Sequence, residues 1–298
     1  MKKKILKTST IWLLSLVVVA SCSRSIKKKL PSRSKKTSWK QGLSLRPIQV
    51  YPGKVVIVDF PFHQEIVPKL QCDNGNEFHL IKKDKMYKAY LVESYFSKLK
   101  PVNCFLTNGA ESKQVLAISI KEFAYKSERL YVNKRRVELA PKDLARAIKE
   151  QKMLNAIYAA GSQTAYFDEA FQTPLKSKIT SYYGARRVFN KKKKTQHLGT
   201  DYRARIGVPI KAVNRGKVVF SGNLFYTGNA VIIDHGLGIF TVYGHLSKLI
   251  AKKGELVVKN SLLGLSGNTG RVSGPHLHWG VKISGHWVDG ISLVDQGI

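Results

Sequence analysis

From about residue 170 to the end of the chain, short runs of β-branched and aromatic residues alternate with glycines. The runs at 217–220, 230–233 and 239–243 have the length and composition of strands, and the glycines between them suit tight turns. A tight turn can join only antiparallel neighbours, because a parallel pair needs a long crossover connection. This region is therefore predicted to fold as an antiparallel sheet and not as a parallel α/β fold.

An earlier region, residues 47–137, also consists of short β-prone runs, which prolines and Asn-Gly turns separate. We interpret it as a small β-sandwich. Between the two regions, apolar residues recur at helical spacing, with Pro141 placed for a first turn and Gly161 for a C-terminal stop. The chain is thus predicted to be mainly β, with an N-terminal β-sandwich-like domain, a connecting helix and a C-terminal antiparallel β-sheet domain.

The N-terminus has the features of an export signal. Lysines open the chain, an apolar stretch covers residues 11–20, and small residues precede Cys22. The residues ending at Cys22 resemble the lipobox of bacterial lipoproteins, which implies a cleaved signal peptide and a lipidated cysteine. A plain signal peptide with an incidental cysteine is the alternative. Ser23, the next residue, resembles outer-membrane sorting in some bacteria.

These features divide the chain into five parts. We expect a lipoprotein signal peptide at 1–21, a basic tether at 22–46, the N-terminal β-domain at 47–137, a helical linker at 138–164 and the C-terminal domain at 165–298. The expected location is the cell envelope, with the exported protein anchored to a membrane through the lipid on Cys22 and the outer membrane favoured.

The 298 residues carry a net charge of +32, and removal of the signal peptide would take away four lysines and leave +28. A charge of this size suggests a polyanionic partner such as nucleic acid. Export argues against that class, and the sequence has no module in which aromatic and basic residues interleave. We therefore expect no nucleic-acid partner, and the anions within reach are cell-wall carboxylates and phosphates or lipid headgroups.

The cysteines agree with export. With Cys22 assigned to lipid, Cys72 and Cys104 remain as a candidate disulfide pair, which an oxidising compartment would permit. Two unpaired buried cysteines are the alternative.

Three stretches carry side chains suited to metal chemistry. His276 and His278 begin a strand-like run, and the period of two places both on one face. His197 and Asp201 lie four residues apart, where a loop entering a strand can bring them to one point. Imidazole nitrogen and carboxylate oxygen are ordinary zinc ligands, and three of them, with His278 included, leave one zinc position open for water.

A further histidine, His245, ends another apolar run. With His276 it would place two imidazoles beside the proposed metal. A metal-bound water needs a general base and a tetrahedral oxyanion needs a donor, and the two histidines could divide these roles. Taken singly, each of these histidines is better explained as a structural residue.

Together these motifs resemble the lysostaphin/LytM-type zinc metallopeptidases, which cleave peptide bonds in peptidoglycan. The resemblance covers roughly residues 170–298 and is carried by Thr180-Ser181-Tyr182-Tyr183-Gly184, His197, Asp201-Tyr202, the glycine-rich segment 264–270 and Gly274-Pro275-His276-Leu277-His278. It implies that His197, Asp201 and His278 bind Zn²⁺ and that His245 and His276 are the catalytic histidines. It further implies a site in a long groove between loops. We choose His276 as the base, because its spacing ties it closely to His278, and expect His245 to hydrogen-bond the water or the oxyanion.

Some relatives have lost these residues and only activate other wall hydrolases, so a catalytically silent, wall-binding regulator is the alternative function. Every metal and catalytic position of the motif is filled here. Cross-links ending in D-alanine and glycine bridges are both substrates within the family, and the lipoprotein context favours D,D-cross-links.

Two segments depart from the family pattern. The basic segment 186–195 is interpreted as a loop, which either walls the groove and attracts stem-peptide carboxylates or is simply solvated. Asn260 stands where relatives often have a turn glycine, and asparagine tolerates a left-handed backbone there.

Overall fold

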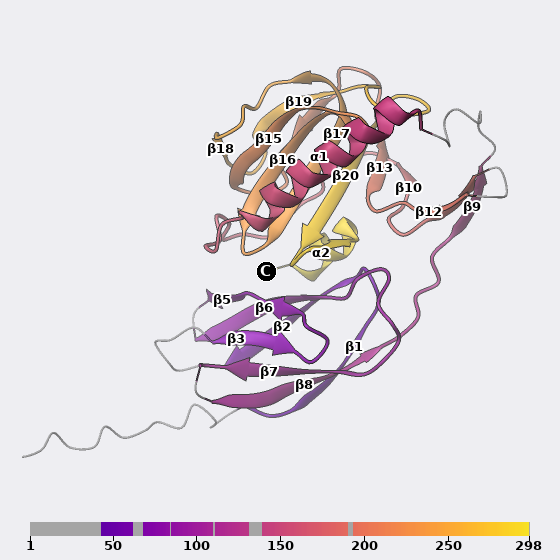
Figure 1. Cartoon of the computed structure of the whole chain (residues 1–298). Helices are drawn as coiled ribbons and strands as arrows, with labels where there is room; N and C mark the ends of the chain where they lie inside the picture. Colours follow the sequence, from indigo (N-terminus) through magenta and orange to yellow (C-terminus); the bar gives the residue numbers. More distant parts are fainter. Residues whose placement is uncertain are drawn as a thin grey trace, which may run out of the picture. The chain divides into compact units, whose positions relative to one another are not determined.

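The computed structural model describes residues 43–61, 68–83, 85–109, 111–130, 139–189 and 193–297. The predicted signal peptide, Cys22 and most of the basic tether lie outside these residues. Within the described part, no helix is both long enough and apolar enough to cross a membrane. The described chain is mainly β, as the sequence predicts (Figure 1).

Two sheets form from the described residues between 43 and 120. Their strand orders are β1-β8-β7-β3-β4 and β2-β6-β5, and β1 runs parallel to β8 while the other neighbours are antiparallel. Alternate residues of these strands face a shared apolar core, as in β7, where Val102, Cys104 and Leu106 are buried. The strands are β1 (Arg46–Val50), β2 (Val55–Pro61), β3 (Lys69–Cys72), β4 (Glu77–Phe78), β5 (Leu80–Lys83), β6 (Met86–Val92), β7 (Val102–Thr107) and β8 (Ser112–Ile120).

A disulfide joins two of these strands. Cys72 of β3 lies directly opposite Cys104 of β7, and their sulfurs are bonded. Of the two alternatives that the sequence left for these cysteines, the structure has the paired one.

The C-terminal region forms a larger sheet in which all pairings are antiparallel. Its main path is β10-β13-β20-β17-β16-β15-β18, and β14, β19 and β21 attach to it. The strands are β10 (Ile179–Ser181), β13 (Thr200–Arg203), β14 (Pro209–Lys211), β15 (Gly216–Leu224), β16 (Gly228–Gly236), β17 (Ile239–Leu249), β18 (Leu256–Val257), β19 (Leu262–Ser266), β20 (His276–Ile283) and β21 (His286–Val288).

Tight turns connect these strands, as the glycine pattern predicts. Leu237 and Gly238 link β16 to β17 with φ of 54° and 75°, the positive values that such hairpin turns require. Asn260, in the turn before β19, has φ of 70°, so it occupies the left-handed conformation that the sequence analysis allowed for it.

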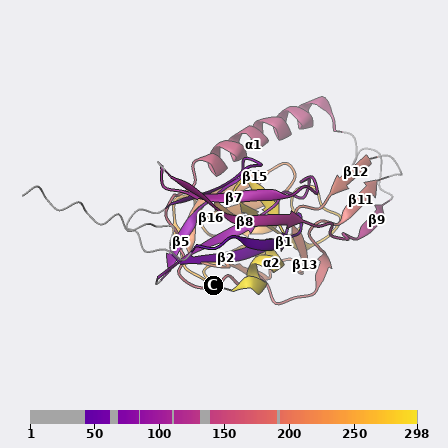
Figure 2. The ribbon, with the colours of Figure 1, turned by 90° about the horizontal axis from the view of Figure 1, so that it is seen from below.

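The described residues contain two helices. α1 (Pro141–Ala159) starts with proline in its first turn and ends before Gly161, which confirms the predicted linking helix. Its Leu154 and Tyr158 pack against residues of β16 and β17. Figure 1 and Figure 2 both show α1 alongside β15 and β16. The short α2 (Gly290–Gln296) follows β21 and is capped by the Asp289 side chain, which accepts a hydrogen bond from the Ile291 amide.

The basic segment before His197 is not the loop that the sequence suggested. β11 (Arg186–Phe189) and β12 (Lys193–Gln196) pair as an antiparallel hairpin, and β9 (Ser127–Leu130) runs parallel to β11. A run of lysines disfavours a strand in the core, but a hairpin needs only main-chain hydrogen bonds, which neighbouring strands supply. The prediction of a loop was therefore wrong for 186–189 and 193–195, which lie in strands.

Candidate metal centre

The site is built on β20, which lies between β13 and β17. The strand register places Asp201 of β13 opposite His278 on one side, and Gly244 of β17 opposite His278 on the other. Because side chains alternate along a strand, His276 and His278 share one face of the sheet, while Leu277 is buried on the other. The pairing of β13 with β20 thereby makes neighbours of Asp201 and His278, which are 77 positions apart in sequence.

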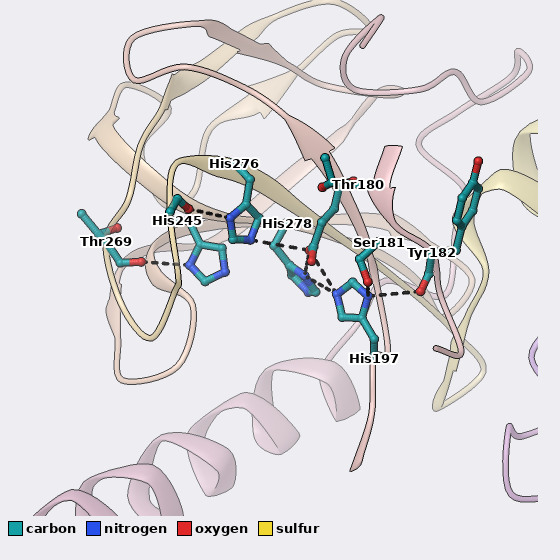
Figure 3. Close-up of polar contacts among 10 residues, drawn as sticks. Thr180, Ser181, Tyr182, His197, His245, Thr269, His276 and His278 are labelled. Atoms are coloured by element: carbon teal, nitrogen blue, oxygen red, sulfur yellow. Dashed lines mark hydrogen bonds and ion pairs between the residues drawn. The ribbon is translucent and has the colours of Figure 1, made fainter. Parts of the chain in front are cut away.

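Three side chains converge beside this face. The Asp201 Oδ1 lies 3.0 Å from the His197 Nε2 and 2.9 Å from the His278 Nδ1, and the two nitrogens are 3.2 Å apart. Figure 3 shows His197 and His278 turned toward each other. These three residues form the candidate metal-binding group of the described chain.

The three ligand atoms fit a zinc ion. Zinc–ligand bonds of about 2.0–2.1 Å in a tetrahedron place neighbouring ligand atoms about 3.3 Å apart, close to the separations observed here. Two imidazole nitrogens and one carboxylate oxygen, without a cysteine, also match a centre that keeps its fourth position for water. His197, Asp201 and His278 would therefore hold the ion.

The electrostatics of Asp201 agree with this fit. Burial alone would raise the pKa of Asp201, but hydrogen bonds with His197 and His278 and their charges hold it well below its usual range. Asp201 is only 8% exposed, and a buried negative charge is costly unless a positive group pairs with it. A metal ligand has to be deprotonated, and Asp201 is deprotonated here.

The segment before β11 fixes the orientation of His197. The His197 Nδ1 lies 3.2 Å from the carbonyl oxygen of Tyr182 and 3.2 Å from the hydroxyl of Ser181. Because a carbonyl only accepts, Nδ1 carries the proton and the Nε2 lone pair is directed at the metal site. Main-chain bonds hold His197 as well, from its amide to the Ala185 carbonyl and from the Gly184 amide to its carbonyl.

A glycine makes room for the third ligand. A Cβ added at Gly199 would lie 2.3 Å from Cε1 and 2.7 Å from Nε2 of His278. The glycine between His197 and Asp201 therefore permits the close approach of the His278 ring.

His245 and His276 form a second pair beside the ligands. Their ring centroids are 4.7 Å apart, and the His276 Nε2 lies 3.7 Å from Asp201 Oδ1. The Nδ1 of His276 is 2.8 Å from the Gly274 carbonyl, and the Nδ1 of His245 is 2.9 Å from the Thr269 carbonyl (Figure 3). Each Nδ1 therefore donates its proton to a carbonyl, and in the neutral ring each Nε2 keeps a lone pair for the site.

His245 is held in an unusual state. Its backbone has φ of 64°, a left-handed value that is rare for a residue with a side chain. Burial, followed by the charges of His278 and His276, lowers the pKa of His245 to about 3. At neutral pH the ring is therefore uncharged and can accept a hydrogen bond at Nε2.

The supporting groups of the site were not found in the sequence. They are the carbonyl oxygens of Tyr182, Thr269 and Gly274, and the space left by Gly199. A carbonyl oxygen is common to all residues, so only the resemblance of the segments 180–184, 264–270 and 274–278 to a known family could have marked the positions of these three carbonyls. The structure brings together all five residues proposed for the metal and the catalysis, and His235 lies in another part of the same sheet.

The fold and the site define a class of protein, an antiparallel β-sheet domain with three side chains that could hold a metal ion. Comparison with known proteins shows which family this domain resembles. Residues 195–290 match the model of Peptidase family M23. Peptidoglycan DD-endopeptidase ShyA of Vibrio cholerae is 44% identical over 124 residues, which are 40% of this chain and 29% of ShyA. DD-carboxypeptidase/endopeptidase Mpg of Neisseria meningitidis is 40% identical over 97 residues, covering 33% of this chain and 22% of Mpg.

A solved structure extends the likeness beyond the sheet of the site. It is an M23 peptidase candidate from Pseudomonas aeruginosa, with a TM-score of 0.67 and 25% identity over 83% of this chain and 95% of that one. Residues 195–290 therefore carry a Peptidase family M23 domain. The chain spans less than a third of the length of ShyA or Mpg in these matches.

Proposed function

We propose that the protein is a zinc-dependent endopeptidase that hydrolyses the peptide cross-links of bacterial peptidoglycan. The observation that supports this proposal is a cluster of five side chains. The ligand atoms of His197, Asp201 and His278 lie within 4.8 Å of one another, and His245 and His276 lie beside them with each Nδ1 bonded to a carbonyl. The match to Peptidase family M23 supports hydrolysis of a peptide bond, and the activity named for ShyA supports peptidoglycan peptides as the substrate.

The roles of the five residues follow from their hydrogen bonds. Bound to His197, Asp201 and His278, Zn²⁺ would supply an acidified water and polarise the scissile carbonyl. His276 takes the proton of the attacking water at Nε2, because the Gly274 carbonyl holds the proton of that ring at Nδ1. His245 is too weak a base at neutral pH to share that task. Its Nε2 accepts a hydrogen bond and orients the water.

We propose D,D-cross-links as the bond class, because both named relatives carry that activity in their names. The decisive experiment digests purified cross-linked peptidoglycan with residues 23–298, with and without a zinc chelator, and identifies the fragments by mass spectrometry. We expect zinc-dependent conversion of cross-linked dimers to monomers, with new D-alanine carboxyl ends. His278→Ala should abolish both zinc retention and conversion, because it removes one of three ligands.

Two outcomes would contradict this function. Full conversion by His278→Ala would remove His278 from the metal site. No conversion by the zinc-loaded wild type would favour the silent regulator, which would then have to stimulate a second wall hydrolase in the same assay.

We propose further that the mature chain is exported and anchored to the cell envelope by lipid on Cys22, with the basic tether between anchor and β-domain. The residues before Cys22 and the wall substrate support this location. Expression of the full chain with labelled palmitate should label the wild type and not Cys22→Ser, which should also leave the membrane fraction. Equal labelling of the two would refute the anchor.

A further inference from the structure

The loop that joins β15 to β16 contacts the backbone of His245. The carbonyl of Thr227 in this loop accepts the amide of His245 at 2.7 Å, and the carbonyl of Tyr226 accepts the amide of Arg271 at 3.0 Å. The left-handed backbone of His245 costs free energy, and it persists only when its surroundings hold it in place. The β15–β16 loop is one of the elements that do so.

A second loop, which carries Thr269, interlocks with the first. A Cβ at Gly228 would lie 2.3 Å from the carbonyl carbon of Thr269, and one at Gly270 would lie 2.3 Å from the amide nitrogen of Gly228. The two loops therefore touch backbone to backbone. Thr269 supplies the carbonyl that fixes the His245 ring, so a shift of the β15–β16 loop would displace both the main-chain and the side-chain contacts of His245.

Helix α1 holds the β15–β16 loop from outside the family domain. The Glu150 Oε2 accepts the amide of Phe225 at 2.7 Å, and its Oε1 accepts the Arg146 Nε at 2.7 Å. The Arg146 Nη2 in turn donates to the Asn223 Oδ1 at 2.9 Å. The Glu150 side chain is only 17% exposed, and a charge-assisted bond to a main-chain amide is stronger when water is excluded.

We propose that Glu150 is a positioning residue of the peptidase. It fixes the first amide of the β15–β16 loop, and through Thr227 and Thr269 it keeps the His245 Nε2 aimed at the attacking water. The linking helix, which lies outside the matched residues 195–290, is thereby part of the machinery that sets turnover. This role rests on the proposed function of the same site.

The test compares matched variants of residues 23–298 on a purified cross-linked muropeptide dimer. Glu150→Ala should lower kcat about tenfold, leave KM within about twofold, and retain zinc, because only the aim of His245 changes. Glu150→Gln should return kcat to within about threefold of wild type, since its amide oxygen can still accept the Phe225 amide. Glu255→Ala is the control, because it removes a carboxylate that accepts the amide of Lys252 in a different turn, and it should leave kcat unchanged.

Wild-type kcat in Glu150→Ala, or an equal fall in Glu255→Ala, would overturn the proposal, and so would failure of Glu150→Gln to restore turnover. Should Glu150→Ala not fold, Arg146→Gln weakens the same contacts and should lower kcat about threefold at unchanged KM. Wild-type turnover in Arg146→Gln would then overturn it.

Hydrogen exchange separates this proposal from the proposed function. In Glu150→Ala, the amides of Phe225 and His245 should exchange at least about tenfold faster than in wild type, while the Lys252 amide is unchanged. This result is expected even if the wild type cleaves nothing, which would refute the proposed function alone. Unchanged exchange at Phe225 and His245 would refute the positioning role alone.

Discussion

His235 and His245 lie on neighbouring strands of one sheet, and both are buried, yet the structure gives them different roles. His235 has both ring nitrogens satisfied, with Nδ1 2.7 Å from the Arg215 carbonyl and Nε2 2.8 Å from the Thr241 hydroxyl. His245 has only its Nδ1 bonded, and among the described residues its Nε2 has no hydrogen-bond partner. A buried histidine with one nitrogen left for the site can act on a substrate, whereas one with both nitrogens bonded can only stabilise the fold.

The strongest test of this contrast gives His235 and His245 the same substitution. His245→Gln should lower kcat about 10²–10⁴-fold at unchanged zinc content, because the glutamine amide does not hold an acceptor at the position of the imidazole Nε2. His235→Gln should keep the zinc content and kcat of the folded protein but lower the free energy of unfolding by about 1–3 kcal/mol, since buried partners lose their bonds. Kinetics on peptidoglycan dimers and chemical denaturation check both.

Equal turnover defects in the two variants would show that hydrogen-bond saturation does not distinguish the two histidines. A wild-type kcat in His245→Gln would remove that residue from the mechanism.

The pH dependence of the free energy of unfolding tests the structural role of His235 directly. Burial, partly opposed by the bond to the Arg215 carbonyl, lowers the pKa of His235 to about 4. Between the ordinary pKa of about 6.5 and this value the unfolded chain binds the extra proton and the folded chain does not. Stability should therefore fall as the pH drops from about 6.5 to 4, and His235 alone should contribute about 3 kcal/mol of that fall.

The measurement is the free energy of unfolding of wild type and His235→Gln at several pH values in this window. The variant should be less stable at pH 7 and show the smaller pH slope, because its side chain does not titrate. Parallel slopes would mean that His235 does not carry the shifted proton equilibrium.

Much of the fold follows from local sequence patterns. The spacing of glycines and β-prone runs predicts the antiparallel sheet, and Pro141 and Gly161 mark the ends of α1 closely. Turn and cap preferences act over a few residues, so one sequence suffices to see them. The wrong prediction at 186–195 shows the limit, because pairing of β11 with β9 depends on a partner far away in the chain.

The site likewise has features that local sequence patterns predict and features that depend on long-range contacts. The period of two predicts that His276 and His278 share a face, which β20 provides. The register that sets Asp201 opposite His278 is a long-range property of the sheet, and no local pattern states it. The aim of His245 depends on the carbonyls of Thr227 and Thr269 and on Glu150 of α1, and nothing in the residue types at those positions reveals the role.

The smallest expected effect concerns the metal ligands and tests how closely the sheet must pack around them. Gly199→Ala would place a methyl group 2.3 Å from the Cε1 of His278, so the ring has to move away from residue 199. We expect zinc affinity to fall about 10–100-fold, the range found when groups that orient a ligand are changed. Gly274→Ala is the matched control, because a Cβ there meets nothing within 4 Å even though its carbonyl bonds His276. Competition with a chelator of known affinity measures the zinc affinity of both variants.

An unchanged zinc affinity in Gly199→Ala would show that the His278 ring can shift without losing the metal. An equal loss in Gly274→Ala would mean that the flexibility of these loops, not the contact with His278, limits zinc binding.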